Sequence, residues 1–326
     1  MKILLTGASG FLGSHTAKEL CRRDHEVFAL VRPTSRRDHL ESLGVQLVEG
    51  ALPDCQGLEP TLNKVDAVIH VAGIVKALSQ REFNQVNAQG TENLANKVLQ
   101  ATPRPRFFLH VSSIAVHNPQ EGKDFCLPSE QCNPLSHYGQ SKLKGELALK
   151  PLSGKVRTVI LRPPVLYGPG DTEILPLFKA LSRGFAPLFQ EGNNQVSLCY
   201  IEDVARAIAD LIEKNLSSDE IYCLDDGATY SLRGLARNIS EILGKKAQMI
   251  HLPYPAFFLA AGLSQTWAQI RRKPAVFTLN KLKEIKQSHW VCGAEKLHNH
   301  LGWEARVPLR EGMTQTLAYY RETGLL

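Results

Sequence analysis

The sequence predicts an α/β protein built on a doubly wound parallel sheet, with a smaller C-terminal domain that is interleaved with it in sequence. Short, nearly continuous apolar runs recur in the first half of the chain, and helix-like amphipathic segments lie between most of them. This alternation is typical of a parallel sheet that is covered by helices on both faces. A glycine-rich turn after the first apolar run indicates the same fold class, because it leads a strand directly into a helix.

The apolar runs of the first half are the expected strands, since each is rich in valine, isoleucine, leucine or phenylalanine. They are residues 2–7, 26–31, 45–50, 66–73, 106–113 and 157–163. From about residue 172 the pattern changes to amphipathic helices, short strands and loops with prolines, although 197–213 and 220–225 again resemble sheet-associated pieces. We therefore expect one domain at 1–171 plus about 199–226, and a second at about 172–198 and 227–326.

Composition and charge exclude several classes of function. The 326 residues carry a net charge of +6 with mostly scattered cations, which gives no support to a nucleic-acid partner. The seven cysteines show no Cys-x-x-Cys pair, no His/Cys ligand spacing and no signal peptide before them. We expect reduced thiols, no metal site and a cytoplasmic location. The longest apolar stretch, residues 253–263, is shorter than the roughly 20 residues that span a bilayer.

The segment "TGASGFLG" follows the first expected strand and opens the first expected helix. Glycines at positions 7, 10 and 13 let the backbone turn tightly and approach a pyrophosphate, which would lie on the free N–H groups and positive dipole end of that helix. The alternative is a merely structural turn. The candidate cofactor-binding residues here are Gly7, Ser9, Gly10, Phe11, Leu12 and Gly13.

The end of the second expected strand favours a phosphorylated cofactor. An NAD site of this kind usually has an acidic residue there to bind the ribose hydroxyls. In this chain the strand ends at Val31, Arg32 follows, and Arg36 and Arg37 are close behind. An arginine can bind a 2′-phosphate through paired, charge-assisted hydrogen bonds. The sequence therefore favours NADP over NAD, and the alternative is that the arginines form a solvated loop.

A tyrosine and a lysine stand four positions apart in "HYGQSK", before a strongly helix-forming segment. On a helix this spacing places Tyr138 and Lys142 on one face, about one turn apart. The pair is either part of an ordinary amphipathic surface or a proton-transfer device, and its spacing alone does not decide between them.

Several motifs together resemble the extended short-chain dehydrogenase/reductases, also called the NAD-dependent epimerase/dehydratase family. The resemblance covers nearly the whole chain in the family's order and spacing. It rests on "TGASGFLG", "HVAG" (70–73), "VNAQGTENL" (86–94), "HVSSIAV" (110–116), "YGQSK", "LRPPVLYGPGD" (161–171) and "YIEDVARAI" (200–208). It implies a Rossmann-type dinucleotide-binding domain, followed by the smaller substrate domain.

The resemblance implies that Ser113, Tyr138 and Lys142 form the catalytic triad. Tyr138 would be the acid or base at the substrate oxygen, Lys142 would lower the pKa of Tyr138, and Ser113, rather than Ser112, would hold the same oxygen. Lys142 would also bind the nicotinamide ribose. Further candidates at the cofactor are Ala72, Gly73, Asn87, Pro163 and Val165, with Lys76 and Tyr167 in the pocket. For Asn87 a helix-start cap is the alternative role.

Some other residues are not expected to take part in catalysis, and others depart from the family pattern. His15 and His117 are expected to be structural or surface histidines, and Asp124 and Glu130 do not match a dehydratase spacing. Gly50 and Ala51 replace the usual acidic residue after the third strand, which puts a hydrogen bond to adenine in doubt. Val196 stands where nucleotide-sugar enzymes commonly carry an arginine, and this counts against a UDP-sugar substrate.

We interpret the chain as an NAD(P)-dependent oxidoreductase acting on a ketone or secondary alcohol, similar to the dihydroflavonol-reductase and 3β-hydroxysteroid-dehydrogenase branches. The alternatives are a nucleotide-sugar epimerase or dehydratase with tightly bound NAD(P), and a non-catalytic dinucleotide sensor, which would tend to lose the tyrosine or lysine. The resemblance suggests a homodimer. Residues 252–286 combine aromatic and aliphatic residues with clustered cations, which is what a peripheral membrane contact needs. Core or dimer packing is the alternative. The membrane-contact interpretation implies a sterol-like or lipid-derived substrate.

Overall fold

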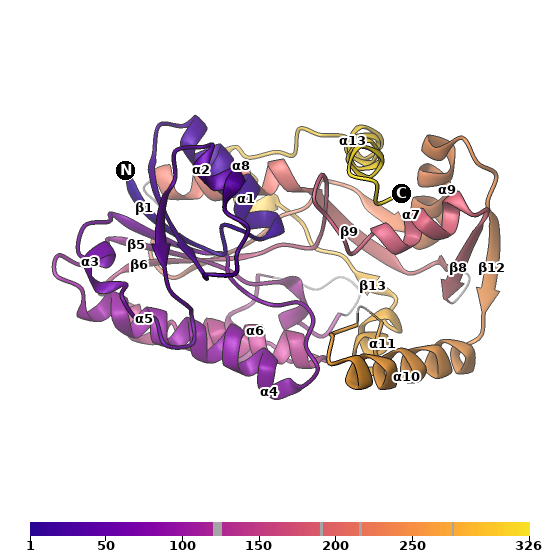
Figure 1. Ribbon diagram of the computed structural model, residues 1–326, viewed down its shortest axis with the longest axis horizontal. Helices are drawn as coiled ribbons and strands as arrows, with labels where there is room; N and C mark the ends of the chain where they lie inside the picture. The colour runs from indigo at the N-terminus through magenta and orange to yellow at the C-terminus, as the bar shows by residue number, and fades with distance from the viewer. Residues whose placement is uncertain (120–125, 190–191, 215–216, 276) are drawn as a thin grey trace.

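The computed structural model describes residues 1–119, 126–189, 192–214, 217–275 and 277–326. Its centre is a parallel sheet with the strand order β10-β6-β5-β4-β1-β2-β3 (Figure 1). The strands are β1 Lys2–Thr6, β2 Glu26–Val31, β3 Gln46–Glu49, β4 Ala67–His70, β5 Phe107–Val111, β6 Arg157–Arg162 and β10 Glu220–Cys223. The expected α/β fold is confirmed.

Helices cover both faces of this sheet, which is why its strands are apolar almost throughout. Figure 1 shows α1 and α8 on one side and α5 and α6 on the other. One core cluster joins the sheet to α1 and α8, and a second joins it to α5 and the turns around α3. The helices are α1 Phe11–Arg22, α2 Asp38–Glu41, α3 Glu59–Leu62, α4 Gln80–Phe83, α5 Gly90–Gln100, α6 His137–Leu147 and α8 Ile201–Glu213.

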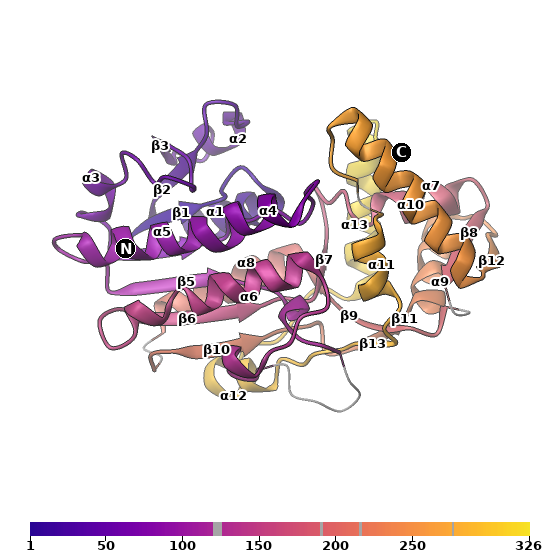
Figure 2. The ribbon, with the colours of Figure 1, turned by 90° about the horizontal axis from the view of Figure 1, so that it is seen from below.

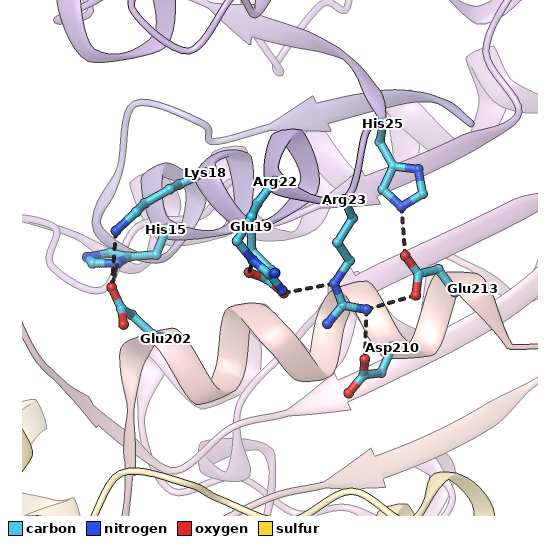
Figure 3. A network of polar contacts seen from close by, with 9 residues as sticks. All are labelled: His15, Lys18, Glu19, Arg22, Arg23, His25, Glu202, Asp210 and Glu213. Atoms are coloured by element: carbon cyan, nitrogen blue, oxygen red, sulfur yellow. Dashed lines mark hydrogen bonds and ion pairs between the residues drawn. The ribbon is translucent and has the colours of Figure 1, made fainter.

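Helix α8 packs on α1 although nearly two hundred residues separate them in sequence. Arg23 donates to Asp210 and Glu213 of α8, both at 2.8 Å, and its Nε lies 2.8 Å from Glu19 on its own helix (Figure 3). His25 lies 3.0 Å from Glu213 in the same network. Several charges that share partners stabilise more than isolated surface pairs do. The network fixes α8, and with it the preceding strand β9 (Gln195–Tyr200), against the first half of the chain.

The second half of the chain builds two smaller sheets beside the large one (Figure 2). In the first, β9 pairs with β7, β11 and β13, and in the second β8 pairs with β12. These strands are β7 Val165–Tyr167, β8 Phe185–Phe189, β9 Gln195–Tyr200, β11 Thr229–Ser231, β12 Gln248–Leu252 and β13 His289–Trp290. The helices are α7 Leu175–Ser182, α9 Leu232–Leu243, α10 Tyr254–Arg271, α11 Leu279–Ile285, α12 Glu295–Leu301 and α13 Leu309–Glu322.

The amphipathic helices of this half bury their apolar faces in a core of their own. Buried residues of α7, α9 and α13 pack against β7, β8 and β9 in one cluster. Helix α10 differs from them, because only Ala261 and Ala268 of its residues are buried. Within the described ranges of the chain, no helix is both long and apolar enough to cross a bilayer.

Candidate active site

The glycine-rich loop lies where β1 passes into α1, at the carboxyl edge of the large sheet. Gly7 has a φ of +77°, and a Cβ atom on it would lie 2.6 Å from the backbone nitrogen of Ala72 at the end of β4. Any larger residue would therefore push apart the loop and the strand end that the resemblance assigns to the cofactor. Gly7 is required here both for its backbone conformation and for its close approach.

The loop and the helix behind it fit a pyrophosphate. A Cβ on Gly13 would lie 1.9 Å from the carbonyl oxygen of Gly7, so the first turn of α1 can meet the loop only through glycine. The helix begins at Phe11 with Gly10 as N-cap, no side chain caps it, and no acidic residue lies in its first turn. Its N-terminal N–H groups and dipole are left for an anion. Leu12 is buried, so it would contribute through its backbone, as would Ser9 beside it.

The end of β2 has the charges that the sequence analysis expects. Val31 is buried, and Arg32 begins an exposed turn that is closed by a 3.2 Å hydrogen bond from its backbone nitrogen to the Ser35 hydroxyl. Arg37 pairs with Glu49 at 2.8 Å, so its charge is partly compensated. Among the described residues the Arg32 guanidinium has no hydrogen-bond or ion-pair partner, and it remains available to an anionic ligand.

Ser113, Tyr138 and Lys142 come together between β5 and α6. Lys142 is buried, and its Nζ donates a 2.6 Å hydrogen bond to the carbonyl oxygen of Val111 at the end of β5. Ser113 follows two residues later, and its side chain is close enough to the hydroxyl of Tyr138 to act on the pKa of that group. Ser112 points elsewhere, and its hydroxyl is buried without a partner among the described residues. The structure therefore groups the three residues that the resemblance named.

The pKa values of the pair differ from the sequence-based expectation. Burial raises the pKa of Tyr138 to about 12, the hydrogen bond from Ser113 opposes the rise, and the carboxylates of Glu284 and Glu173 add to it. Burial lowers the pKa of Lys142 to about 8, while Glu146 one turn along the helix opposes that shift. The expected lowering of the Tyr138 pKa by Lys142 is wrong for the protein alone, because desolvation of the phenol and the two nearby carboxylates outweigh the opposing effect of Ser113.

Asn87 lies at the centre of a buried polar network beside Lys142. Its amide accepts from the backbone nitrogen of Ile74 at 2.8 Å and donates to the Ile74 carbonyl and the Ser141 hydroxyl, both at 2.9 Å. Asn87 stands in a π-helical segment, Asn84–Gln89, between α4 and α5, and Ser79 caps the start of α4. The alternative role as a helix-start cap is therefore wrong. A Cβ on Gly73 would lie 3.1 Å from the Asn87 oxygen and 3.6 Å from the Lys142 nitrogen, so these three residues are neighbours.

Comparison with known proteins agrees with this geometry. The family model described as "NAD dependent epimerase/dehydratase family" matches residues 3–224. This chain belongs to that family. A protein of Caulobacter vibrioides named "Ceramide reductase" is 30% identical over an alignment of 326 positions that covers 99% of this chain and 96% of the relative. The "4-hydroxy-2-methyl-3-oxo-4-farnesyl-3,4-dihydroquinoline-1-oxide ketoreductase" of Stigmatella aurantiaca is 27% identical over 96% of this chain and 95% of its own.

Among solved structures, the UDP-glucose 4-epimerase of Thermotoga maritima with UDP-glucose superposes with a TM-score of 0.78 at 21% identity, covering 99% of both chains. That likeness shows the shared fold. Membership of the epimerase/dehydratase family, together with named reductases among the relatives, identifies the chain as an enzyme, an NAD(P)-dependent oxidoreductase.

Residues that the sequence analysis missed reach this site from the second half of the chain. Glu284 of α11 and Glu173, before α7, both act electrostatically on Tyr138. Asn280 of α11 accepts a 3.0 Å hydrogen bond from the backbone nitrogen of His137, which precedes Tyr138. Lys76 forms an ion pair with Glu173. No local pattern marks the two glutamates, since only the tertiary fold brings them to Tyr138.

Glu146, in contrast, could have been found from its spacing. It follows Lys142 by four positions on α6, and its buried carboxylate accepts two hydrogen bonds from Arg162, at 2.9 and 2.6 Å. The Glu146–Arg162 pair lies directly beneath the helical turn that carries Lys142. The i,i+4 spacing of Lys142 and Glu146 is the signal in the sequence that marks this residue.

The remaining candidates divide into residues at the site edge and residues of the core. Pro163 is buried after β6, and Val165 is exposed at the start of β7. Tyr167 is wrong as a pocket residue: its ring is fully buried against Tyr200 in the core of the second half, since β7 pairs with β9.

The two histidines are structural, as expected. His15 bonds the Pro169 carbonyl at 2.9 Å, and His117 is buried against Arg162. Glu130 pairs with Lys150 at the surface, and Asp124 lies outside the described residues.

Proposed function

We propose that the enzyme is an NADP(H)-dependent reductase of hydrophobic ketones, with Tyr138, Ser113 and Lys142 as its catalytic residues. The observation that carries the proposal is the grouping of Ser113 and Tyr138 beside the buried Lys142, next to a glycine loop that fits a dinucleotide. A bound nicotinamide would supply or accept the hydride at the carbonyl carbon.

Each of the three side chains has a separate task in this proposal. The Tyr138 hydroxyl gives its proton to the substrate oxygen as the carbonyl becomes an alcohol. Ser113 donates a hydrogen bond to the same oxygen while negative charge develops there. The Lys142 ammonium stabilises the phenolate that remains on Tyr138, and its burial makes that charge effective over a short distance.

The direction of reaction proposed is reduction. With a pKa of about 12, Tyr138 carries its proton at neutral pH and is ready to act as an acid. Oxidation of an alcohol would first need Tyr138 as a phenolate, which is costly at this buried position. The resting protonation state thus favours ketone reduction.

We propose NADP(H) as the preferred cofactor because Arg32 follows β2 where an NAD enzyme usually has a carboxylate. Its guanidinium is exposed, and Ser35 holds the turn in which it lies. Arg37 is the less suitable partner for a 2′-phosphate, since Glu49 already occupies it.

We propose a lipid-derived or sterol-like ketone as the substrate class. The relatives named above include a ceramide reductase and a ketoreductase of a farnesylated quinoline, and both names describe hydrophobic substrates. Val196 is the half-buried residue at the position where a sugar-nucleotide pyrophosphate would need a cation; it pairs in register with Tyr230 and Trp290. Burying a pyrophosphate there without a cation is costly.

A nucleotide-sugar epimerase is the second candidate, since the fold is shared with a UDP-glucose 4-epimerase. Such an enzyme returns its hydride and consumes no cofactor. A panel of ketones of rising chain length, assayed with NADPH, with NADH and beside UDP-glucose, separates the two. We expect NADPH consumption that increases with the apolar length of the ketone. Conversion of UDP-glucose without net cofactor consumption, with every ketone inert, would contradict the proposal.

We also propose that the enzyme is a cytoplasmic homodimer that makes a peripheral contact with a membrane through residues 252–286. The dimer rests on the family resemblance alone. Light scattering on the purified protein measures the mass directly, and a monomeric mass at micromolar concentration would contradict it.

A further inference from the structure

Helix α10 carries a row of large apolar side chains that face solvent. Leu259, Leu263, Trp267 and Ile270 are 64, 64, 55 and 69% exposed. At 100° per residue they lie within about 80° of one another, and the row is roughly 16 Å long at 1.5 Å per residue. We call these four residues the α10 stripe. Scattered exposed leucines are ordinary, but a contiguous row on one helix marks a contact surface.

The opposite face of α10 holds the helix to the protein. Ala261 and Ala268, about half a turn from the stripe, are its buried residues, and Phe257 packs edge-on against Phe189 and Phe277. The stripe is therefore the solvent-facing side of a helix whose opposite side is packed against the protein. Core packing, one of the alternatives for this segment, does not apply to these four side chains.

The charges of the segment that carries the stripe are almost all positive. Residues 252–286 contain six cations, and their only carboxylate, Glu284, is buried and paired with Lys281 at 2.6 Å. Among the described residues no carboxylate pairs with the other five, which are Arg271, Arg272, Lys273, Lys283 and Lys286. Arg271 lies over the Trp267 ring at 4.6 Å, so the cationic and apolar parts of the surface are continuous.

We propose that the α10 stripe and its five unpaired cations bind the surface of an anionic phospholipid bilayer. The apolar residues would enter the boundary between head groups and acyl chains, and the cations would meet the phosphates. A second copy of the chain fits less well, because its own α10–α11 segment would bring no free carboxylate to these cations. The five cations without a carboxylate partner likewise favour anionic over neutral lipid.

Helix α11 connects this surface to the active site. Gln265 of α10 accepts a 3.3 Å hydrogen bond from the backbone nitrogen of Leu279, and Asn280 bonds the backbone of His137 next to Tyr138. Both views show α10 at the edge of the molecule with α11 beside it (Figures 1 and 2). A bilayer at α10 would lie one helix away from the catalytic tyrosine. Membrane binding itself does not depend on the proposed reaction. Access of a lipid-derived ketone from the bilayer to the active site, in contrast, rests on that proposed function.

The test measures binding of the purified full chain, without cofactor or substrate, to vesicles of phosphatidylcholine alone or mixed with phosphatidylglycerol. We expect binding to the mixed vesicles at low salt and its loss at high salt. Arg271→Glu combined with Lys273→Glu should weaken binding about tenfold or more, at roughly 1 kcal/mol per cation. Lys245→Glu combined with Lys246→Glu reverses two exposed lysines elsewhere in the second half and should bind like the wild type.

Trp267 supplies a second readout at the stripe itself. Its fluorescence should shift to shorter wavelength on binding mixed vesicles, and Trp267→Phe should abolish the shift while leaving binding largely intact. Leu263→Ser should weaken binding without altering the melting temperature, since this side chain faces solvent. No binding to anionic vesicles at low salt, or a dimer that Leu263→Ser converts to monomer, would overturn the inference. A catalytically inactive protein that still binds would contradict only the proposed function.

Discussion

Lys142 and Val111 are joined by a 2.6 Å hydrogen bond from the lysine ammonium to the backbone carbonyl oxygen. This bond ties helix α6 to the carboxyl end of β5, two residues before Ser113. Because Tyr138 lies one turn earlier on the same helix, this contact fixes the position of α6, and so of Tyr138, relative to the end of β5. That alignment brings the side chains of Ser113 and Tyr138 together.

Replacing Tyr138 by phenylalanine tests the proposed acid most simply. The change removes the hydroxyl and little else, so we expect turnover to fall by roughly a hundredfold to ten-thousandfold. Binding of NADPH, measured by fluorescence titration, should stay close to that of the wild type. Near-normal turnover of an authentic ketone by Tyr138→Phe would show that another group supplies the proton.

Lys142→Met should remove activity and yet stabilise the protein without cofactor. Burial lowers the lysine pKa from 10.5 to about 8, so below pH 8 the folded state holds a buried charge at a cost. The gain is on the order of 2 kcal/mol, at about 1.4 kcal/mol per pKa unit less the lost hydrogen bond to Val111. This cost disappears as the pH rises from 8 towards 10.5. In that range Lys142 is neutral in the folded protein and still protonated in the unfolded chain, so the folded state no longer holds a buried charge.

Urea unfolding of wild type and Lys142→Met at several pH values measures that effect. The difference in unfolding free energy between the two should be largest below pH 8 and should narrow as the pH rises. Lys144→Met, about half a turn away on the exposed side of α6, is the control and should show no such trend. A Lys142→Met protein that is less stable than wild type at neutral pH would mean that the lysine is structural.

Exchanging the end of β2 should change cofactor choice. Val31→Asp with Arg32→Ala supplies a carboxylate for the ribose hydroxyls and removes the cation for a 2′-phosphate. The ratio of the NADPH and NADH dissociation constants should move towards NADH. Arg37→Ala serves as the control, because Glu49 already pairs with it at 2.8 Å. An unchanged ratio in the double variant would eliminate Arg32 as the selecting residue.

Glu146→Gln should destabilise the fold strongly. Both partners of the Glu146–Arg162 pair have fully buried side chains, so the change leaves the Arg162 charge uncompensated at a cost of about 3–5 kcal/mol. Glu130→Gln breaks the surface pair with Lys150 and should change little. Thermal unfolding of the two variants compares them directly, and equal melting temperatures would show that the buried pair is not needed.

The sequence predicted the parts of this site that depend on local pattern. Gly7, Gly10 and Gly13 marked the loop because their spacing reflects close approaches within a few residues, and Tyr138 and Lys142 share a helix face. The strands were recognisable because burial on both faces leaves them apolar throughout.

What the sequence could not predict depends on contacts between distant segments. The Tyr138 pKa is raised because burial and two distant glutamates act on the ring, and Glu173 and Glu284 carry no local signal. Tyr167 is in the core because β7 pairs with β9, a register that its three residues do not specify. The exposure of the α10 stripe could not be predicted either, because a leucine-rich helix looks the same in sequence whether it faces the core or solvent.

Transfer of a labelled hydride tests the central claim most directly. The enzyme is incubated with a long-chain ketone and NADPH that carries deuterium at both C4 positions, and both products are quantified by mass spectrometry. We expect one NADP⁺ for each alcohol formed, with one deuterium on the carbinol carbon, and roughly a hundredfold or more less of this product with Tyr138→Phe in the same time. Alcohol without the label, or cofactor that is never consumed while a nucleotide sugar is epimerised, would contradict it.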